Sequence, residues 1–374
     1  MTSESKDKIQ IQKLLSLAGI TIKGDKPWDI QVHNDRLYRR VLTEGSLGLG
    51  ESYMDGWWDC NRLDEFFFRI LRNRLDEEVR WNWPLLRRAA ISRIVNRQSR
   101  SRAFIIGEKH YDTGNDLFQH MLGKSMAYSC GYWPNARNLD EAQEAKFDLI
   151  CRKLGLKKGM TLLDIGCGWG TLMCHATKKY GVSAVGITVS KEQAELAREL
   201  CKGLPVDIRL QDYRDLKKKF DRIVSVGMFE HVGYKNYKTY VRVVHRCLKD
   251  DGLFLLHTIA NHKAKGVSDP WIEKYIFPNS HLPSIKLMDD ALEKFFVMED
   301  WHNFGADYDK TLMAWYHNFE NNWDDIKANY NERFYRMWKY YLLSCAGSFR
   351  ARKNQLWQIV LSKKGVRGGY KSVR

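Results

Sequence analysis

Residues 162–170 read LLDIGCGWG, an apolar run that ends in glycines at every second position. The run predicts a buried β-strand. Gly166, Gly168 and Gly170 predict a sharp turn after it, in which the backbone passes close to a ligand. A helix expected to begin at Thr171 would present its unpaired N–H groups to that ligand. We therefore interpret this strand, turn and helix as the ligand-binding unit of an α/β fold.

Strands and helices alternate along the chain on the C-terminal side of this unit. Apolar patterns predict strands at residues 160–166, 183–190, 206–212, 220–232 and 252–260. Helical periodicity predicts helices over 116–122, 139–156 and 191–201, and others that begin at Thr171 and Tyr237. Nearly continuous apolar strands that alternate with helices are typical of a doubly wound parallel sheet, covered by helices on both faces. Ligands of such sheets bind at the carboxyl ends of the strands.

The spacing of the glycines indicates the kind of ligand. A dinucleotide site has the spacing G-x-G-x-x-G and a carboxylate about 20 positions further on. Here the spacing is G-x-G-x-G, Asp164 precedes it, and the second strand ends in Thr188 and Ser190 without a carboxylate. This combination resembles the S-adenosylmethionine loop of the class I methyltransferases, which implies their Rossmann-like doubly wound sheet.

Polar residues at the next strand ends are candidates for further cofactor contacts. Gln193, three residues past Ser190, is the nearest group that could replace the missing ribose-binding carboxylate. Gln211 and Asp212 end the third strand, where the general pattern places residues that face the adenine. Each of these residues alone could instead cap a helix or lie in a solvated turn. Their positions at successive strand ends favour ligand contacts.

The chain is longer than the usual single compact domain, so a second, smaller domain is expected. Residues 44–60 are rich in glycine and predict turns, whereas residues 63–75 have helical periodicity. We predict a small, mostly helical N-terminal accessory and lipid-binding domain at residues 1–100, a linker at 101–112 and a catalytic domain at 113–374.

Residues 301–341 are rich in aromatic side chains and predict two amphipathic helices. Two registers carry these side chains: Leu312, Trp315, Phe319 and Trp323, then Tyr330, Phe334, Trp338 and Tyr341. We favour core packing for most of these residues. The alternative is that some of them wall an apolar channel for lipid.

The formal net charge of +16 indicates a polyanionic partner, but charge alone does not separate RNA from an anionic membrane surface. Residues 87–102 contain six arginines and no acid, and they are interpreted either as a solvated helix that runs into a linker or as a membrane-surface segment. No stretch has the length and apolarity of a membrane span or a secretory signal, so we expect a cytoplasmic protein.

Eight cysteines are scattered along the chain without a C-x-x-C pair or a cluster with histidine. This distribution argues against a structural zinc site and against a disulfide framework. We therefore expect reduced thiols and no metal.

Several segments together resemble the bacterial cyclopropane-fatty-acyl-phospholipid synthases. They are EGSLGLGESYMDGWW, HYDTGNDLF, YSCGYW, LDIGCGWG, SVGMFEHVG, FLLHTI, DPWIEKYIFP and EDWHNFGADYDKTLMAWY. The resemblance runs almost from end to end and includes the N-terminal domain. That domain distinguishes this branch from the shorter mycolic acid cyclopropane synthases, which resemble the catalytic part alone.

The resemblance implies a reaction and its participants. A methylene passes from S-adenosylmethionine to the cis double bond of an unsaturated acyl chain in a membrane phospholipid, and a cyclopropane ring forms. Bound bicarbonate is the implied general base. The implied protein is a homodimer without a nucleic-acid partner, associated peripherally with the anionic surface of the inner membrane.

The resemblance also implies the residues of the site. The bicarbonate ligands fall on Cys130, Glu230, His257, Ile259 and Tyr308. Cys130 and Ile259 are expected to offer backbone N–H groups, and the other three their side chains. The cofactor contacts fall on Tyr128, Ser129, Gly166, Gly168, Thr188, Gln193, Gln211 and Asp212.

Other interpretations of single residues stay open at this point. Cys130 could be a small buried apolar residue, and His257 lies in an apolar run, where a lone histidine is more often part of the core. Glu230 and His231 are adjacent, so only one of them is expected to point into the site from a strand end.

Three other functions compete with cyclopropane formation. A methyltransferase that leaves a simple methyl branch on the acyl chain would have nearly the same sequence. An RNA methyltransferase would agree with the charge, but the chain lacks an Asn/Asp-Pro-Pro-aromatic motif, a paired catalytic cysteine arrangement and a recognisable RNA-binding module. A membrane-associated binding protein with a vestigial cofactor fold is disfavoured by the intact glycine loop and the five matched bicarbonate positions.

Overall fold

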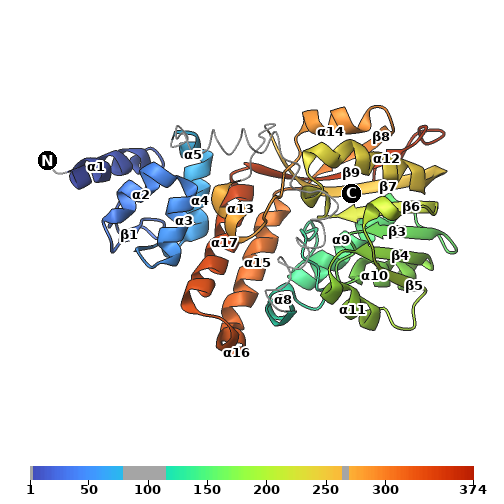
Figure 1. Ribbon diagram of the computed structural model, residues 1–374, viewed down its shortest axis with the longest axis horizontal. Coiled ribbons are helices and arrows are strands. Elements are labelled where there is room, and N and C mark those ends of the chain that lie inside the picture. Colours follow the sequence, from blue (N-terminus) through green and yellow to red (C-terminus); the bar gives the residue numbers. More distant parts are fainter. Residues whose placement is uncertain (1–2, 79–114, 263–268) are drawn as a thin grey trace. The chain divides into compact units, whose positions relative to one another are not determined.

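The computed structural model describes residues 3–78, 115–262 and 269–374 (Figure 1). These residues form two compact units. The first unit contains residues 3–78, 269–278 and 308–354, and the second contains 115–262, 279–307 and 355–374. The predicted linker and the arginine-rich segment lie outside the described residues.

The first unit is mostly helical. Its N-terminal part contains α1 (Ser3–Ser16), α2 (Arg36–Glu44), α3 (Ser46–Met54), α4 (Leu63–Arg72), α5 (Leu75–Glu78) and an antiparallel pair of short strands, β1 (Gln31–Val32) and β2 (Trp58–Asp59). Later segments add α13 (Pro270–Tyr275), α15 (Asp307–Asn321), α16 (Trp323–Ile326), the 3-10 helix η4 (Lys327–Asn329) and α17 (Glu332–Arg350). Helix α17 packs against α4 and α3.

The prediction of turns at residues 44–60 is wrong for most of that region, because α3 occupies Ser46–Met54. The glycines of this helix allow close packing rather than turning. A Cβ on Gly48 would lie 2.5 Å from the carbonyl oxygen of Arg40 on α2, and one on Gly50 would lie 2.3 Å from the ring of Trp271 on α13. The helix predicted at residues 63–75 is confirmed as α4.

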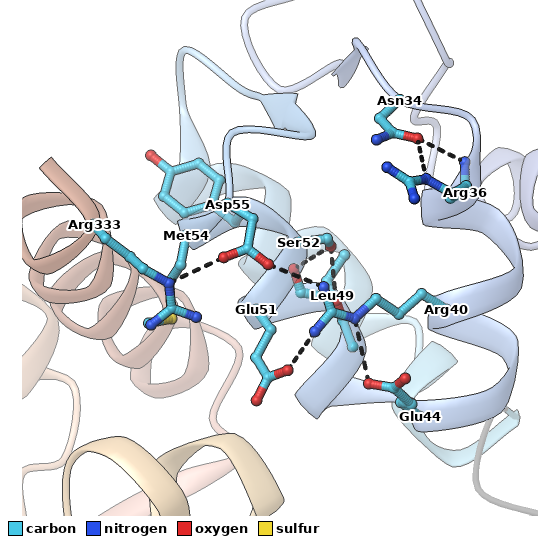
Figure 2. Close-up of polar contacts among 12 residues, drawn as sticks. Asn34, Arg36, Arg40, Glu44, Leu49, Glu51, Ser52, Met54, Asp55 and Arg333 are labelled. Carbon is cyan, nitrogen blue, oxygen red and sulfur yellow. Dashed lines mark hydrogen bonds and ion pairs between the residues drawn. The ribbon is translucent and has the colours of Figure 1, made fainter.

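A network of ion pairs centred on Arg40 connects helices of this unit (Figure 2). Arg40 donates to Asp55 at 3.1 Å and to Glu44 at 3.3 Å, and it also pairs with Glu51. Arg333 of α17 donates to the other carboxylate oxygen of Asp55 at 3.0 Å. Segments from the beginning and the end of the chain are therefore held together by charge as well as by apolar packing.

The aromatic residues of 301–341 have mainly the packing role that was favoured. Buried side chains are those of Leu312, Trp315, Phe319, Trp338 and Tyr341. Trp323 begins α16 and Tyr330 precedes α17, so each lies outside the helix that its register predicted. The half-buried rings still stack, with the ring centres of Tyr330 and Phe334 4.4 Å apart.

The second unit is built on a seven-stranded sheet with the order β5-β4-β3-β6-β7-β9-β8. The strands are β3 (Thr161–Ile165), β4 (Ser183–Thr188), β5 (Val206–Leu210), β6 (Phe220–Val226), β7 (Leu248–Asn261), β8 (Val297–Asn303) and β9 (Asn354–Ser362). The first five pair in parallel, and β8 pairs with β9 in antiparallel fashion. The chain adds β4 and β5 on one side of β3 and then crosses to add β6 and β7 on the other.

Helices cover both faces of this sheet, as predicted. The helices of this unit are α8 (Asn115–Leu122), α9 (Leu139–Lys153), α10 (Thr171–Tyr180), α11 (Lys191–Leu200), α12 (Tyr237–Cys247) and α14 (Ile285–Leu292), with the 3-10 helices η1 (Tyr213–Asp215), η2 (Phe229–His231) and η3 (Tyr234–Asn236). Neighbouring residues of β3 face opposite cores: Leu162 packs with α9, α10 and α11, whereas Leu163 packs with α12 and α14. The predicted doubly wound α/β fold is confirmed.

Within the described ranges, no helix is both long and apolar enough to cross a bilayer.

The contact between α17 and α4 depends on a glycine. A Cβ on Gly347 would lie 2.6 Å from the carbonyl oxygen of Asp64 and 2.7 Å from the amide nitrogen of Phe68. We predict that Gly347→Ala lowers the free energy of unfolding by about 1–3 kcal/mol, because the helices must move apart. Urea titration followed by tryptophan fluorescence measures this change.

The matched control for that prediction is Ser348→Ala on the same helix. Alanine is more favourable than glycine inside a helix by about 1 kcal/mol. If the added methyl group met no close neighbour, Gly347→Ala would therefore stabilise the protein. A stability equal to or above that of the parent would therefore contradict the close contact.

Candidate active site

A cavity of about 210 Å³ opens at the carboxyl ends of the parallel strands. Segments that follow β3, β4, β5 and β6 line it, together with residues of α9 and of the segment before that helix. The cavity lies where the chain changes direction across the sheet, with β4 on one side of β3 and β6 on the other. This is the position at which open α/β sheets bind their ligands.

The glycine loop has the conformation expected from its sequence. Gly166, Gly168 and Gly170 have φ angles of 82°, 53° and 82°. These positive angles favour glycine, because a residue with a side chain would be strained there. A Cβ on Gly166 would lie 2.6 Å from the Cβ of Met228, which also lines the cavity. The amide of Gly166 donates to the carbonyl of Ile187 at 2.9 Å, so the loop is fixed to the end of β4.

All the residues predicted to contact the cofactor line this one cavity. They are Tyr128, Ser129, Gly166, Gly168, Thr188, Gln193, Gln211 and Asp212. The hydroxyl of Thr188 donates to the side-chain carbonyl of Gln193 at 2.9 Å. Asp212 accepts from the backbone and the guanidinium of Arg214 at 2.8 and 2.7 Å. Their contact with a cofactor stays a prediction, but their placement in one cavity agrees with it.

Sequence reasoning missed a buried lysine in the wall of the cavity. Lys146 of α9 donates to the hydroxyl of Ser129 at 2.8 Å and to the side-chain carbonyl of Gln143 at 2.6 Å. Gln143 in turn donates to the carbonyl of Ser129 at 2.8 Å. Two side chains of α9 therefore hold the segment that carries Tyr128 and Cys130.

Lys146 also acts on the carboxyl group that precedes the glycine loop. Burial raises the pKa of Asp164 to about 7, although the charge of Lys146 opposes the shift. Burial likewise lowers the pKa of Lys146 to about 7, against the attraction of Cys130 and Asp164. One oxygen of Asp164 has no hydrogen-bond partner among the described residues. The cavity thus contains two groups whose charge changes near neutral pH.

The sequence contained a signal for this lysine. Lys146 stands four residues after Ala142 and four before Ile150, on the face of the 139–156 helix that its apolar residues predicted to be buried. A charged residue at such a position needs partners or a function.

A second polar cluster lies between η2 and the end of β7. The carboxylate of Glu230 accepts from the backbone amide of Ile259 at 2.6 Å, and its other oxygen has no partner within the described part of the chain. Burial raises the pKa of Glu230 to about 7, although the hydrogen bond from Ile259 opposes the shift. The Ile259 amide, expected to face a bound ion, here donates to Glu230, since a buried carboxylate needs a donor.

His257 is a buried residue of β7 and lies close in the sequence to this cluster. Its Nδ1 lies 3.2 Å from the side-chain nitrogen of Gln358 on β9, a residue that sequence reasoning missed. Burial holds the pKa of His257 well below its usual range, and the charges of Lys146 and Lys153 add to the effect. Nδ1 pairs with the side-chain amide of Gln358, whereas Nε2 has no partner among the described residues. This arrangement differs from that of a structural core histidine, in which both ring nitrogens would be hydrogen-bonded.

The neighbours Glu230 and His231 point in different directions. His231 lines the cavity, and burial lowers its pKa to about 4, so the ring is neutral. Glu230 faces Ile259 instead. Cys130 is buried, and its thiol donates to the carbonyl of Gly131 at 3.2 Å.

Tyr308 belongs to the first unit, unlike the other four predicted bicarbonate ligands. Its ring stacks on that of Phe349 with the centres 4.4 Å apart. The structure therefore brings Glu230 and Ile259 into contact and describes Tyr308 within a separate unit.

The arrangement defines what the site can do. The cavity can hold an extended polar ligand along the ends of β3, β4 and β5. Glu230 offers a carboxyl group whose pKa burial raises to about 7, and His257 offers a neutral imidazole, since burial lowers its pKa. Such unpaired buried groups fit a small oxyanion, which both accepts and donates hydrogen bonds. Throughout the residues that the structure describes, no three His, Cys, Asp or Glu side chains are grouped to hold a metal ion.

Comparison with known proteins assigns the chain to a family. The family model described as "Mycolic acid cyclopropane synthetase" matches residues 98–359. The cyclopropane-fatty-acyl-phospholipid synthase of Escherichia coli is 58% identical over 362 residues, which are 97% of this chain and 94% of that protein. A probable fatty acid methyltransferase of Pseudomonas putida is 39% identical over 68% of each chain.

A solved structure supports the same assignment. The mycolic acid cyclopropane synthase CmaA1, complexed with SAH and CTAB, has a TM-score of 0.66 and is 35% identical. The match covers 70% of this chain and 98% of that one. Because the family model, the sequence relatives and the fold agree, this chain belongs to the cyclopropane synthase family and is an enzyme with the class I methyltransferase fold.

Proposed function

We propose that this enzyme transfers a methylene from S-adenosylmethionine to the cis double bond of an unsaturated acyl chain in a membrane phospholipid, forming a cyclopropane ring. The extent of one match carries the proposal. The Escherichia coli phospholipid enzyme aligns over 97% of this chain, including the N-terminal unit, whereas CmaA1 covers 70%. This longer match supports a phospholipid rather than a mycolic acid as the substrate.

The cavity at the strand ends is the proposed cofactor site. The eight residues predicted from the family pattern line it, and CmaA1, which shares the fold, was solved with SAH. In our proposal, the glycine loop gives the ligand close access to the backbone and to the N-terminus of α10. Lys146 and Gln143 position the Tyr128–Ser129 side of the cavity through their hydrogen bonds to Ser129.

The reaction also needs a base. An alkene that attacks the sulfonium methyl group leaves a carbocation on the acyl chain, and loss of a proton then lets the ring close. Bound bicarbonate would supply this base. We propose that Glu230, His257 and Tyr308 hold it with their side chains, and that Cys130 and Ile259 do so with backbone N–H groups. The Ile259 N–H would then turn to the ion from Glu230, to which it donates in the structure.

The contacts of Glu230 and His257 support this assignment. One carboxyl oxygen of Glu230 and the Nε2 atom of His257 have no hydrogen-bond partner among the described residues. These atoms are buried, so leaving them unpaired would cost roughly 1–3 kcal/mol each. The thiol of Cys130 needs no nucleophilic role, because methyl transfer from a sulfonium requires no covalent enzyme intermediate.

We propose a cytoplasmic enzyme that is peripherally associated with the inner membrane. The net charge of +16 supports attraction to an anionic leaflet. The arginine-rich segment at 87–102 is the candidate contact, and it lies outside the described residues. Homodimer formation stays a prediction.

One competing reaction is favoured by a specific observation. The Pseudomonas putida relative is called a probable fatty acid methyltransferase, which agrees with a methyl branch as the product. The two reactions start from the same carbocation and differ in how it is quenched. The structure of the lipid product therefore separates them.

The proposed reaction predicts a defined product. Incubation of the full chain with labelled S-adenosylmethionine and vesicles of a mono-unsaturated anionic phospholipid should yield acyl chains that are heavier by one CH₂ and show cyclopropane protons by NMR. Saturated vesicles are the control and should take up no label. A branched chain without ring protons would instead establish the competing methyl transfer.

Glu230 provides a test of the proposed base-binding cluster. We expect Glu230→Gln to bind the cofactor as the parent does and to lose about 100-fold or more in kcat, because the residue holds the base rather than the cofactor. Calorimetry of cofactor binding and initial rates at saturating lipid give the two quantities. Glu293→Gln, an exposed change in the same unit, is the control. Equal kcat in Glu230→Gln and the parent would remove Glu230 from the mechanism.

Removal of bicarbonate from the buffer tests whether the ion takes part in the reaction. Activity in degassed buffer depleted of bicarbonate should fall, and added bicarbonate should restore it, whereas chloride at the same ionic strength should not. Cofactor binding measured in both buffers should stay unchanged. A rate that survives depletion to trace levels would mean that a protein side chain is the base.

A further inference from the structure

Two cysteines that are distant in the sequence meet in the second unit. Cys174 lies in the first turn of α10, and Cys201 caps the end of α11. They are 27 positions apart in the chain, and their sulfur atoms are 2.7 Å apart. A disulfide bond is about 2.05 Å long, so less than one ångström separates this contact from a bond. The pair lacks the C-x-x-C spacing by which paired cysteines can be predicted from a sequence.

The two thiols differ in exposure and acidity. Cys174 is partly exposed, whereas Cys201 is buried. The hydrogen bond between them lowers the pKa of Cys174, and the nearby charge of Lys178 adds to this effect. The same hydrogen bond raises the pKa of Cys201, and burial adds to the shift. An accessible, more acidic thiol beside a buried one is the usual arrangement of an attacking and a resolving cysteine.

The pair touches the glycine loop. The amide of Cys174 donates to the carbonyl of Gly170 at 3.0 Å, and the thiol of Cys201 lies 3.7 Å from the same oxygen. A Cβ on Gly170 would lie 3.0 Å from the sulfur of Cys201. Gly170 ends the loop that carries Gly166 and Gly168. A covalent change at either sulfur therefore occurs next to the backbone of the candidate cofactor site.

We propose that Cys174 and Cys201 form a thiol–disulfide site that reacts with small disulfides such as oxidised glutathione. The product is an intramolecular disulfide that joins the first turn of α10 to the end of α11. Disulfides in reducing compartments are usually transient and redox-sensing, which agrees with a disulfide that forms and is later reduced again. This proposal does not depend on the substrate of the enzyme.

The exchange balances in two steps. The thiolate of Cys174 attacks one sulfur of oxidised glutathione, which forms a mixed disulfide and releases one glutathione thiolate. Cys201 then loses its proton and attacks Sγ of Cys174, which forms the protein disulfide and releases the second glutathione. Both protein protons pass to the two glutathione thiolates. One oxidised glutathione is thereby reduced while two protein thiols are oxidised.

The test titrates the full chain with mixtures of reduced and oxidised glutathione at neutral pH. After acid quenching and alkylation, we expect mass spectrometry of the parent to show the loss of two of its eight thiols. Digestion without reductant should give a peptide pair cross-linked through Cys174 and Cys201. Reduced glutathione in excess should reverse the change.

Single variants separate the two roles. Cys201→Ser should stop at one glutathione adduct on Cys174, whereas Cys174→Ser and Cys174→Ala should acquire neither the adduct nor the cross-link. Cys345→Ser, a change in the other unit, should behave like the parent. Retention of all eight thiols by the parent in predominantly oxidised glutathione, or a cross-link that maps to another pair, would overturn the proposal.

Discussion

The parallel pairing of β3 with both β4 and β6 is the constraint on which the rest of the second unit depends. Leu162 and Asp164 of β3 each pair with a residue of β4 and a residue of β6. Because the chain leaves β3 toward one neighbour and later returns to the other, the segments that follow these strands diverge. The opening between them is the cavity, and the glycine loop lines it because β3 lies between β4 and β6.

Burial then determines the chemistry of the titratable groups in the second unit, both those that line the cavity and those of the Glu230 cluster. The desolvation cost of a buried charge is several kcal/mol unless partners offset it, so the carboxyls of Asp164 and Glu230 hold protons at a higher pH than they would in water. The same cost keeps the imidazole of His257 neutral. The backbone positions these groups, and the low polarity around them gives them protonation states suited to binding and proton transfer.

A structural feature could be predicted when its signal lay in neighbouring residues, and it was missed when it depended on contacts between segments distant in the sequence. Strand and helix patterns of the second unit are local, so the elements from β3 to β7 were predicted in the right order. The strand predicted at 220–232 was too long, because β6 ends at Val226 and η2 follows it at Phe229–His231. The glycines of α3 were misread, because a glycine chosen for close packing against Arg40 or Trp271 looks the same as one chosen for a turn. Gln358 was missed since its role depends on β9 lying beside β7, a pairing of distant segments. Cys174 and Cys201 likewise meet only through the packing of α10 and α11.

Lys146 and Asp164 have a consequence for the energetics of ligand entry. Both have a pKa near 7, so the cavity gains or loses positive charge over the pH range of living cells. A cation and a proton that enter the same small space repel each other, so each lowers the affinity for the other. A positively charged ligand that filled the cavity would therefore displace protons from Lys146 and Asp164, and it would bind more tightly as the pH rises.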